Sequence, residues 1–454
     1  MIINRYLLAF SMLSLLLGCG SSDSDDEDKT PAEPVEQTFT LTSVITNKCA
    51  KESAFTQVEL LLQDDNWQLL QKYLPDESGE ISFTTTDTNI NYTLVAKNQQ
   101  GDEQAGLDIV SFYQADSSVA AKYYGRYDQQ LDNSSCECVT QDVELRHRSF
   151  TTRTWVASSL PFSDFEAQDE QTTLYRDVEA CRIIGESWPV QSFMVLGTDN
   201  AGDAIGAADI HDNFDANEAR LWAFSAVEVA DEIMLEDEQH AMSSAQIIQG
   251  RRHFPLAVAQ NDASLILFNS HLYSSEADYI TRTNTVYQQT DTFFGTTLTQ
   301  GSHQIISSDY SQSFEVEVSD NKPDVDDENF SELGNDGSYD YSGAGDYPLA
   351  VITYTYAAYD TDTGLFPVKW TSYGPDEGVL PSSVPLSGYE DVINDDTDVQ
   401  STDIELVRSM SSSDYSDYIR YYQQAKQQET ESQKTDNSDF VRDLKTLHLQ
   451  INLN

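Results

Sequence analysis

Four cysteines in the first half of the chain carry its most distinctive chemistry. Cys136 and Cys138 are separated by one residue, Cys49 lies upstream and Cys181 downstream. A Cys-x-Cys pair is too tight for the usual zinc spacing, no second pair or nearby histidine cluster completes a metal site, and a redox Cys-x-x-Cys motif is absent. An even number of such thiols predicts structural disulfides, which persist in the periplasm or outside the cell.

Four cysteines allow three pairings, and the sequence leaves all three open. Cys49 follows the first expected strand, whereas Cys136 and Cys138 begin the last expected strand of the same module. We therefore expect one bond to close that module. The other is expected to tie the module to Cys181 in the next one.

Acidic loops offer a second kind of site, because Ca²⁺ takes several oxygen ligands from flexible loops. Asp360 and Asp362 resemble the start of an Asp-x-Asp-x-x-Gly loop whose glycine comes one place early. Asp324 and Asp326 alternate within the acidic segment 320–340, without a glycine at the sixth position. These four aspartates are the candidate calcium ligands. The competing interpretation is ordinary turn chemistry in a solvated acidic loop.

Motifs of the common enzyme classes are absent from the sequence. There is no His-Glu-x-x-His, no Gly-x-Ser-x-Gly, no P-loop and no glycine-rich dinucleotide turn. A Ser-His-Asp triad or the paired carboxylates of a glycosidase leave no local signature, because their members lie far apart in the sequence. We predict a protein that is not an enzyme and has no cofactor other than a possible calcium ion.

The first 18 residues are organised like an export signal. Arg5 supplies one positive charge, and the apolar run Leu7–Leu17 is too short to span a membrane but typical of a signal peptide. The run ends in Leu16-Leu17-Gly18-Cys19, which resembles the lipobox of bacterial lipoproteins. The resemblance implies cleavage before Cys19, followed by acylation of its sulfur and of the new amine.

Residues 19–37 contain the acylated cysteine and a polar tether. The tether has seven acidic residues, one lysine and two prolines, so it buries no apolar surface and is expected to be an extended, disordered spacer. Two or three acyl chains give firm attachment, which one chain alone does not. Gly20, rather than Asp, follows the cysteine, and the resemblance then implies the outer membrane, with the protein facing the periplasm or the exterior.

The charge of the chain restricts its partners. Lys and Arg number 25 against 77 Asp and Glu, a formal net charge of −52. Nucleic-acid phosphates and anionic lipids both require a concentrated basic surface, which so few cations do not provide. We therefore exclude nucleic acid, expect membrane contact only through acyl chains on Cys19, and leave a protein or glycan partner open.

Strand patterns and turn residues predict an all-β chain. Between residues 38 and 147, seven β runs fit a seven-stranded β-sandwich domain. The runs are Phe39–Thr46, Gln57–Leu62, Trp67–Tyr73, Ile81–Thr85, Tyr92–Ala96, Ile109–Tyr113 and Val139–Leu145.

Two short motifs give this first domain a family resemblance. The segments Asp76-Glu-Ser-Gly-Glu-Ile-Ser-Phe83 and Tyr92-Thr-Leu-Val-Ala96 resemble the carboxypeptidase regulatory-like, transthyretin-type sandwich. The resemblance covers about twenty residues, and the long insertion between Gly101 and Ser135 departs from a compact member. Modules of this family are typically accessory, so the resemblance implies no catalysis here.

Residues 148–454 form a larger mainly-β region without a clean repeat period, as one sandwich or two sub-domains. One short C-terminal helix is expected after Asp414, because Tyr415, Ile419 and Tyr422 share a helical face. Tyrosines on this helix could stack on sugars, although packing in the core is the commoner outcome.

Together these features predict an outer-membrane-anchored lipoprotein with a binding or structural interaction role. The first alternative is a hydrolase acting on polysaccharide, with the N-terminal sandwich as accessory module. The second is a calcium-stabilised surface adhesin.

Overall fold

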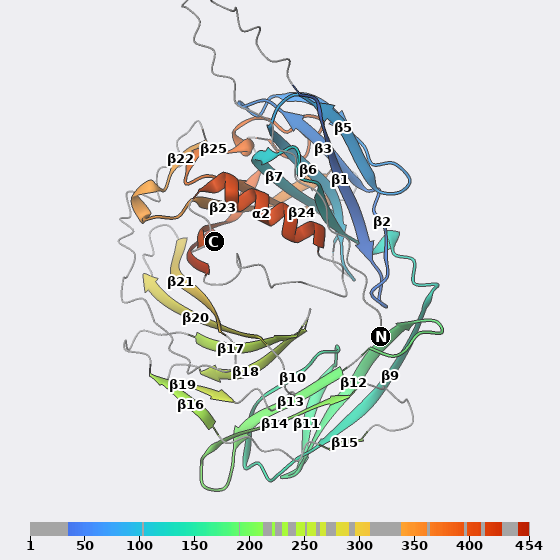
Figure 1. The fold of residues 1–454 in the computed structure, drawn as a ribbon, viewed down its shortest axis with the longest axis vertical. Coiled ribbons are helices and arrows are strands. Elements are labelled where there is room, and N and C mark those ends of the chain that lie inside the picture. Colours follow the sequence, from blue (N-terminus) through green and yellow to red (C-terminus); the bar gives the residue numbers. More distant parts are fainter. Residues whose placement is uncertain are drawn as a thin grey trace, which may run out of the picture. The chain divides into compact units, whose positions relative to one another are not determined.

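A computed structural model describes most of the chain from residue 35 onward. The described residues are 35–101, 104–189, 191–211, 220–222, 229–234, 242–249, 252–259, 264–268, 278–289, 296–308, 337–360, 364–394, 397–409, 414–428 and 444–453. Strands dominate these segments, and one α-helix lies near the C-terminus, so the predicted all-β class with a short C-terminal helix is confirmed (Figure 1).

The first eight strands form two sheets that pack face to face. One sheet contains β1 (Gln37–Thr46), β2 (Glu52–Ala54), β5 (Glu80–Thr85) and β8 (Ala121–Tyr127). The other begins with β3 (Val58–Gln63), β4 (Leu69–Tyr73), β6 (Asn89–Gln99) and β7 (Gly106–Asp116). The end of β8 also pairs with the end of β6, which joins the two sheets at one corner.

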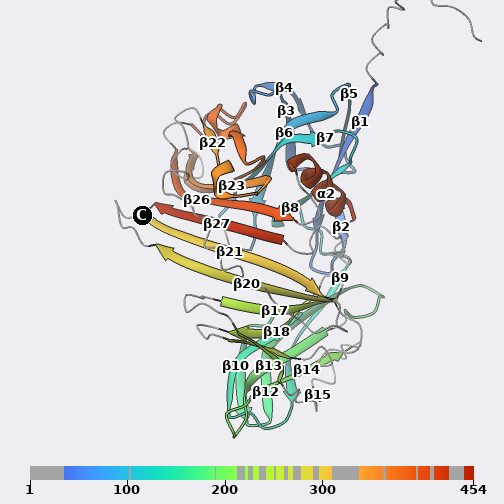
Figure 2. The same cartoon turned by 60° about the vertical axis from the view of Figure 1, so that its left-hand side comes forward.

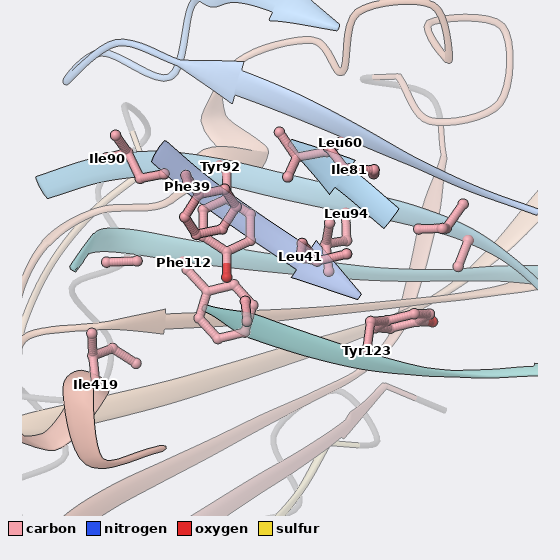
Figure 3. Packing of buried hydrophobic residues seen from close by; sticks show 14 of the residues in the cluster. Phe39, Leu41, Leu60, Ile81, Ile90, Tyr92, Leu94, Phe112, Tyr123 and Ile419 are labelled. Atoms are coloured by element: carbon pink, nitrogen blue, oxygen red, sulfur yellow. The ribbon is translucent and has the colours of Figure 1, made fainter. Parts of the chain in front are cut away.

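Aromatic and aliphatic side chains fill the space between these two sheets (Figure 3). Phe39 of β1 is fully buried. Its ring lies 5.2 Å from the ring of Phe83 in the neighbouring strand β5, and 5.4 Å from the ring of Tyr92 in β6 of the opposing sheet. Tyr92 in turn lies 5.0 Å from Phe112 of β7. Strand alternation in the sequence, with apolar residues every second position, places these rings on the inner faces.

The sandwich differs from the prediction in its final strand. Strand β9 (Cys136–Arg146), which includes the expected Val139–Leu145 run, pairs with β12 (Thr172–Ile183) rather than with the first eight strands. Val143 and Leu145 are buried in a separate core with residues of β12. Strand β8, which lies within the segment 101–135 that departs from a compact member, instead pairs with β1 and completes the first sheet.

A second sandwich follows. One of its sheets contains β10 (Thr152–Ser158), β13 (Gln191–Thr198) and β14 (Ala204–His211). The other contains β11 (Asp164–Asp169), β12, β9 and β15 (Arg220–Trp222). Their shared core is apolar and largely aliphatic, with Tyr175 and Phe193 as its central rings, 4.9 Å apart.

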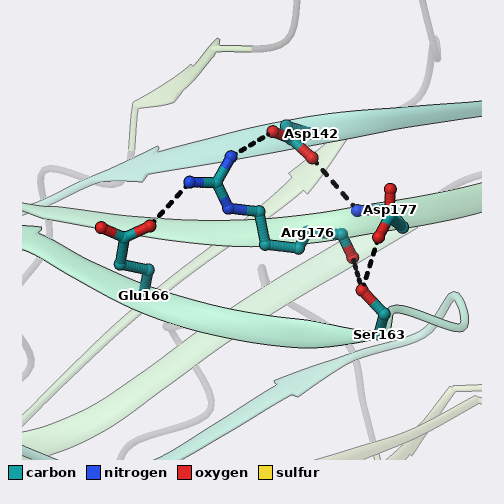
Figure 4. A network of polar contacts seen from close by, with 5 residues as sticks. All are labelled: Asp142, Ser163, Glu166, Arg176 and Asp177. Carbon is teal, nitrogen blue, oxygen red and sulfur yellow. Dashed lines mark hydrogen bonds and ion pairs between the residues drawn. The ribbon is translucent and has the colours of Figure 1, made fainter.

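An ion-pair network braces the exposed side of this second sandwich (Figure 4). Arg176 in β12 binds Asp142 at 2.5 Å and Glu166 at 2.6 Å, carboxylates of two flanking strands. A bulge in β12 places Asp177 at a positive φ of 51°, and its N–H donates to Asp142. That backbone bond, followed by the Arg176 guanidinium, lowers the pKa of Asp142.

The sheet of β3, β4, β6 and β7 does not end at residue 147. Strand β7 pairs in parallel with β24 (Gly364–Gly374), far along the chain. The sheet then continues antiparallel through seven more strands, side by side in Figure 2. These are, in order, β23 (Leu349–Asp360), β26 (Asp398–Ser409), β27 (Leu444–Leu453), β21 (Thr296–Ser308), β20 (Asp278–Gln289), β17 (Met242–Gln249) and β18 (Arg252–Ala259).

Short elements complete the described residues. Strand β16 (Val229–Met234) pairs with β19 (Ser264–Phe268), and β22 (Ser338–Asp340) with β25 (Glu377–Val379). Single 3-10 turns lie at Asp128–Gln130, Ser342–Ala344 and Pro381–Ser383.

The far face of the long sheet carries its own core. Trp370 of β24 is 1% exposed, and its indole N–H donates to the buried Ser111 hydroxyl of β7 at 2.9 Å. Residues from the segments around Tyr341 and Leu386 cover this face. The sheet is therefore buried on both faces where β7 meets β24.

Helix α2 (Tyr415–Gln428) covers the opposite face beside β7 and β8 (Figure 1). The Asp414 carboxylate accepts the Asp417 N–H at 2.9 Å, which caps the helix as expected. Ile419 is fully buried, and the Tyr415 hydroxyl donates to the backbone oxygens of Tyr113 and Tyr373. The helix is thereby fixed to both strands of the parallel pair.

We predict that Phe39→Ala lowers the free energy of unfolding by about 3–5 kcal/mol, because it removes a fully buried ring between two sheets. Phe165→Ala is the matched control, since Phe165 is 39% exposed in β11. Its cost should stay within about 0.5 kcal/mol, as for other surface substitutions. Urea denaturation followed by circular dichroism measures both, and equal losses would contradict the described core.

Candidate functional site

The structure contains the two disulfides that the cysteine count predicted. Cys49 bonds to Cys136, and Cys138 bonds to Cys181. Their roles are the reverse of those expected, because β9 belongs to the second sandwich. The Cys49–Cys136 bond joins the end of the first strand to that sandwich, and Cys138–Cys181 crosses between the paired strands β9 and β12.

These bonds also remove a possible metal site. The Cys138 and Cys181 sulfurs lie with a Glu179 carboxylate oxygen within 4.8 Å of one another. A metal requires thiolates, whereas both sulfurs are bonded to each other. This cluster is therefore structural.

Most of the calcium candidates fall outside the described residues, as does Cys19. This applies to Asp324, Asp326 and Asp362. Asp360 ends β23, directly opposite Gly364 at the start of β24. The four aspartates therefore stay candidate calcium ligands on the strength of the sequence.

A pocket of about 240 Å³ lies between α2 and the strands β1, β6, β7, β8 and β24. Its walls combine aromatic rings, amide side chains and charged groups. The lining residues are Leu41, Tyr92, Leu94, Asn98, Asp108, Val110, Phe112, Ala121, Lys122, Tyr123, Tyr124, Arg126, Lys369, Thr371, Tyr373, Tyr422 and Gln423.

Strand register arranges the pocket floor from charged to aromatic. The parallel pairing of β7 with β24 sets Asp108 opposite Lys369, Val110 opposite Thr371 and Phe112 opposite Tyr373. Strand β6 adds Leu94 beside Val110 and Tyr92 beside Phe112. Because alternate residues share a face, these positions form successive rows on one side of the sheet.

The aromatic end is rigid. The Phe112 and Tyr373 rings stack with centroids 5.0 Å apart, and Tyr422 of α2 lies 5.1 Å from Tyr373. The Tyr373 and Tyr422 hydroxyls are 3.3 Å apart. Burial raises the pKa of Tyr92, Tyr373 and Tyr422, so these phenols stay neutral at physiological pH.

Two amide groups in the pocket have unused hydrogen-bonding capacity. Gln423 on α2 is 2% exposed, and neither its amide nitrogen nor its amide oxygen has a partner in hydrogen-bond geometry. Its side chain approaches the Tyr92 hydroxyl, a contact that opposes the effect of burial on that pKa. The Asn98 amide oxygen is likewise buried and unpartnered. Such groups cost free energy unless a ligand or water satisfies them.

The charged end is mainly basic. Lys122 forms an ion pair with Glu52 at 3.1 Å, and Asp108 accepts a hydrogen bond from Tyr123. Arg126 and Lys369 are exposed, and within the described part of the chain neither forms an ion pair. Three of the 25 cations in a strongly acidic protein therefore line one pocket.

Sequence reasoning missed this pocket because its residues come from strands and a helix that lie far apart in the sequence, from Leu41 to Gln423. Of the tyrosines considered for sugar stacking, Tyr415 and Tyr418 are buried in the core, whereas Tyr422 lines the pocket. The small number of cations, 25 in all, offered one signal, but it does not indicate that Lys122 and Lys369 share a site.

Comparison with known proteins gives this chain no family. No family model and no curated protein matches it. A streptococcal ancillary pilin is 12% identical over 54% of this chain and 89% of its own, with a TM-score of 0.12. A Ca²⁺-stabilized ice-binding adhesin of an Antarctic bacterium is 9% identical over 83% and 95%, with a TM-score of 0.10. Scores this low do not inform the fold or the function.

Within the described residues, no helix has the length and apolar character to span a membrane.

Replacing Gln423 should stabilise the protein. Gln423→Met keeps the length of the side chain and removes two unpartnered polar atoms, so we expect the free energy of unfolding to rise by about 1–3 kcal/mol. Gln424→Met is the control, because Gln424 is the exposed neighbour on the same helix. Thermal unfolding compares the two variants, and destabilisation by Gln423→Met would mean that its amide has partners in the folded protein.

Removing the cross-strand disulfide should destabilise the second sandwich. The bond between Cys138 and Cys181 closes a loop with a sequence separation of 43. The double variant Cys138→Ser/Cys181→Ser is expected to lose about 2–4 kcal/mol, largely because its unfolded chain gains freedom. Denaturation with and without reductant tests this. Unchanged stability of the oxidised variant would contradict a structural role for the bond.

Proposed function

We propose that this protein is an exported lipoprotein that is attached to the outer membrane through acyl chains on Cys19 and binds a ligand in the pocket beneath α2. The lipobox-like Leu16-Leu17-Gly18-Cys19 and the acidic tether support the attachment. The two disulfides support export, since such bonds persist in oxidising compartments. The protein faces the periplasm or the cell exterior, with a glycan or protein as partner.

Exposed Arg126 and Lys369 line a concave pocket together with amide side chains and aromatic rings, and this is the observation that carries the binding role. Pockets with apolar walls and a few convergent polar groups are the usual form of a ligand site. We propose binding without catalysis, because Asp108 is the one carboxylate among the described lining residues, and glycoside hydrolysis normally uses two.

Lipid attachment is tested with the variant Cys19→Ala. In cells of a bacterium that processes lipoproteins, we expect the unaltered protein to fractionate with outer membrane and to carry acyl mass on its N-terminal residue. The variant should keep its signal peptide or leave the membrane fraction. Mass spectrometry of the N-terminal peptide is the measurement. An unaltered protein that is cut elsewhere, or that starts at an unmodified Cys19, would contradict the proposal.

A further inference from the structure

We propose that a second pocket, at the turn between β3 and β4, binds the head group of a quaternary ammonium compound. Its lining shares only Tyr373 with the pocket beneath α2, and the inference does not rest on the function proposed for that other site. The ligand class follows from the aromatic side chains of this second pocket, from the charge around it and from its volume.

Trp67 is placed at this pocket against the preference of the backbone. It lies in the turn between β3 and β4 at a φ of 58°, where glycine or asparagine is usual and a bulky residue is an outlier. Its backbone N–H donates to the Asp64 carbonyl at 3.0 Å, and its indole N–H donates to the Val379 carbonyl at 2.9 Å. Such conflicts between local preference and structure concentrate at functional sites.

Four aromatic side chains line the pocket, namely Trp67, Tyr113, Tyr339 and Tyr373. Trp67 and Tyr339 are buried, whereas Tyr113 and Tyr373 are half-buried. The Trp67 and Tyr113 rings lie 6.1 Å apart and are inclined by 48°, so they meet as adjacent walls. The Tyr339 hydroxyl donates to the Pro375 carbonyl at 3.1 Å, which fixes a third ring. Aromatic rings attract cations through the negative charge of their faces, and tryptophan does so most strongly.

The charge around the pocket selects a cation. Asp65 is exposed and lines the pocket, and no Lys, Arg or His is among the described lining residues. Burial and then the Asp65 carboxylate raise the pKa of Tyr113, which places this negative charge near that ring. Burial, Tyr113 and the Asp376 carboxylate raise the pKa of Tyr339. Two carboxylates therefore act on adjacent rings, and they would repel an anionic ligand.

The volume and the hydrogen bonding of the pocket favour a methylated cation. The volume is about 140 Å³, and an apolar cavity of about 150 Å³ holds one benzene molecule. A trimethylammonium group is no larger than that ring. The Val379 and Pro375 carbonyls already accept hydrogen bonds from Trp67 and Tyr339. A primary ammonium would need acceptors for all its N–H groups, whereas a quaternary ammonium donates no hydrogen bond.

Calorimetric titration of the full-length protein with choline and with its neutral isostere 3,3-dimethyl-1-butanol tests the inference. We expect choline to bind at least about tenfold more tightly, because the two compounds differ in charge and hardly in shape. Glycerophosphocholine, the soluble head group of a choline lipid, is the third ligand. Tighter binding of choline would assign a free cation and tighter binding of glycerophosphocholine a lipid head group, and both results support the site.

Asp65→Asn should lower the affinity for choline about threefold, the size expected of one exposed charge, and leave the neutral isostere unchanged. Asp203→Asn, the same change on the exposed turn between β13 and β14, is the control. Trp67→Leu should lower the affinity for choline at least about tenfold, whereas Trp188→Leu should not. The melting temperature shows whether each variant is folded, and the exposed Asp65 keeps the test valid if Trp67→Leu does not fold.

Three results would overturn the inference. They are equal affinity for choline and its neutral isostere, no binding of choline at millimolar concentration, and binding of choline that Asp65→Asn leaves unchanged.

Discussion

The parallel pairing of β7 with β24 is the constraint on which the rest of the described structure depends. It joins a strand of the N-terminal sandwich to a strand that begins some 250 residues later and thereby makes one sheet of both. The Trp370–Ser111 hydrogen bond and the Tyr415 contacts to both strands lock this pairing from opposite faces. Non-local pairing of this kind costs chain entropy before it gains contacts, so burial on both faces of the sheet must offset that cost.

The same pairing creates the pocket. Its register alone brings Asp108 next to Lys369 and Phe112 next to Tyr373. A shift of one residue would turn these side chains to the opposite face of the sheet, where Trp370 packs. Gln423 of helix α2 also lines the pocket. Its side chain is buried there, beside the Tyr92 hydroxyl.

Sequence patterns predicted what is local and missed what is long-range. The strand runs between Phe39 and Tyr113, the capped helix after Asp414 and the disulfides were all predictable, because alternation, capping and an even cysteine count act within short segments or by simple counting. The pairing partner of the strand Val139–Leu145 was not predictable, since one amphipathic strand fits either of two cores. The pocket escaped prediction for the same reason, as no local pattern links Asn98, Lys369 and Gln423.

We propose that the pocket beneath α2 is a ligand site and that the register of β7 with β24 creates it. A crystal structure of the full-length protein is the measurement that checks both the register and the pocket. We expect Asp108 opposite Lys369 and Phe112 opposite Tyr373, with an open pocket beneath α2 that Arg126 and Lys369 line. A shifted register of β7 and β24, or a pocket filled by protein side chains, would contradict it.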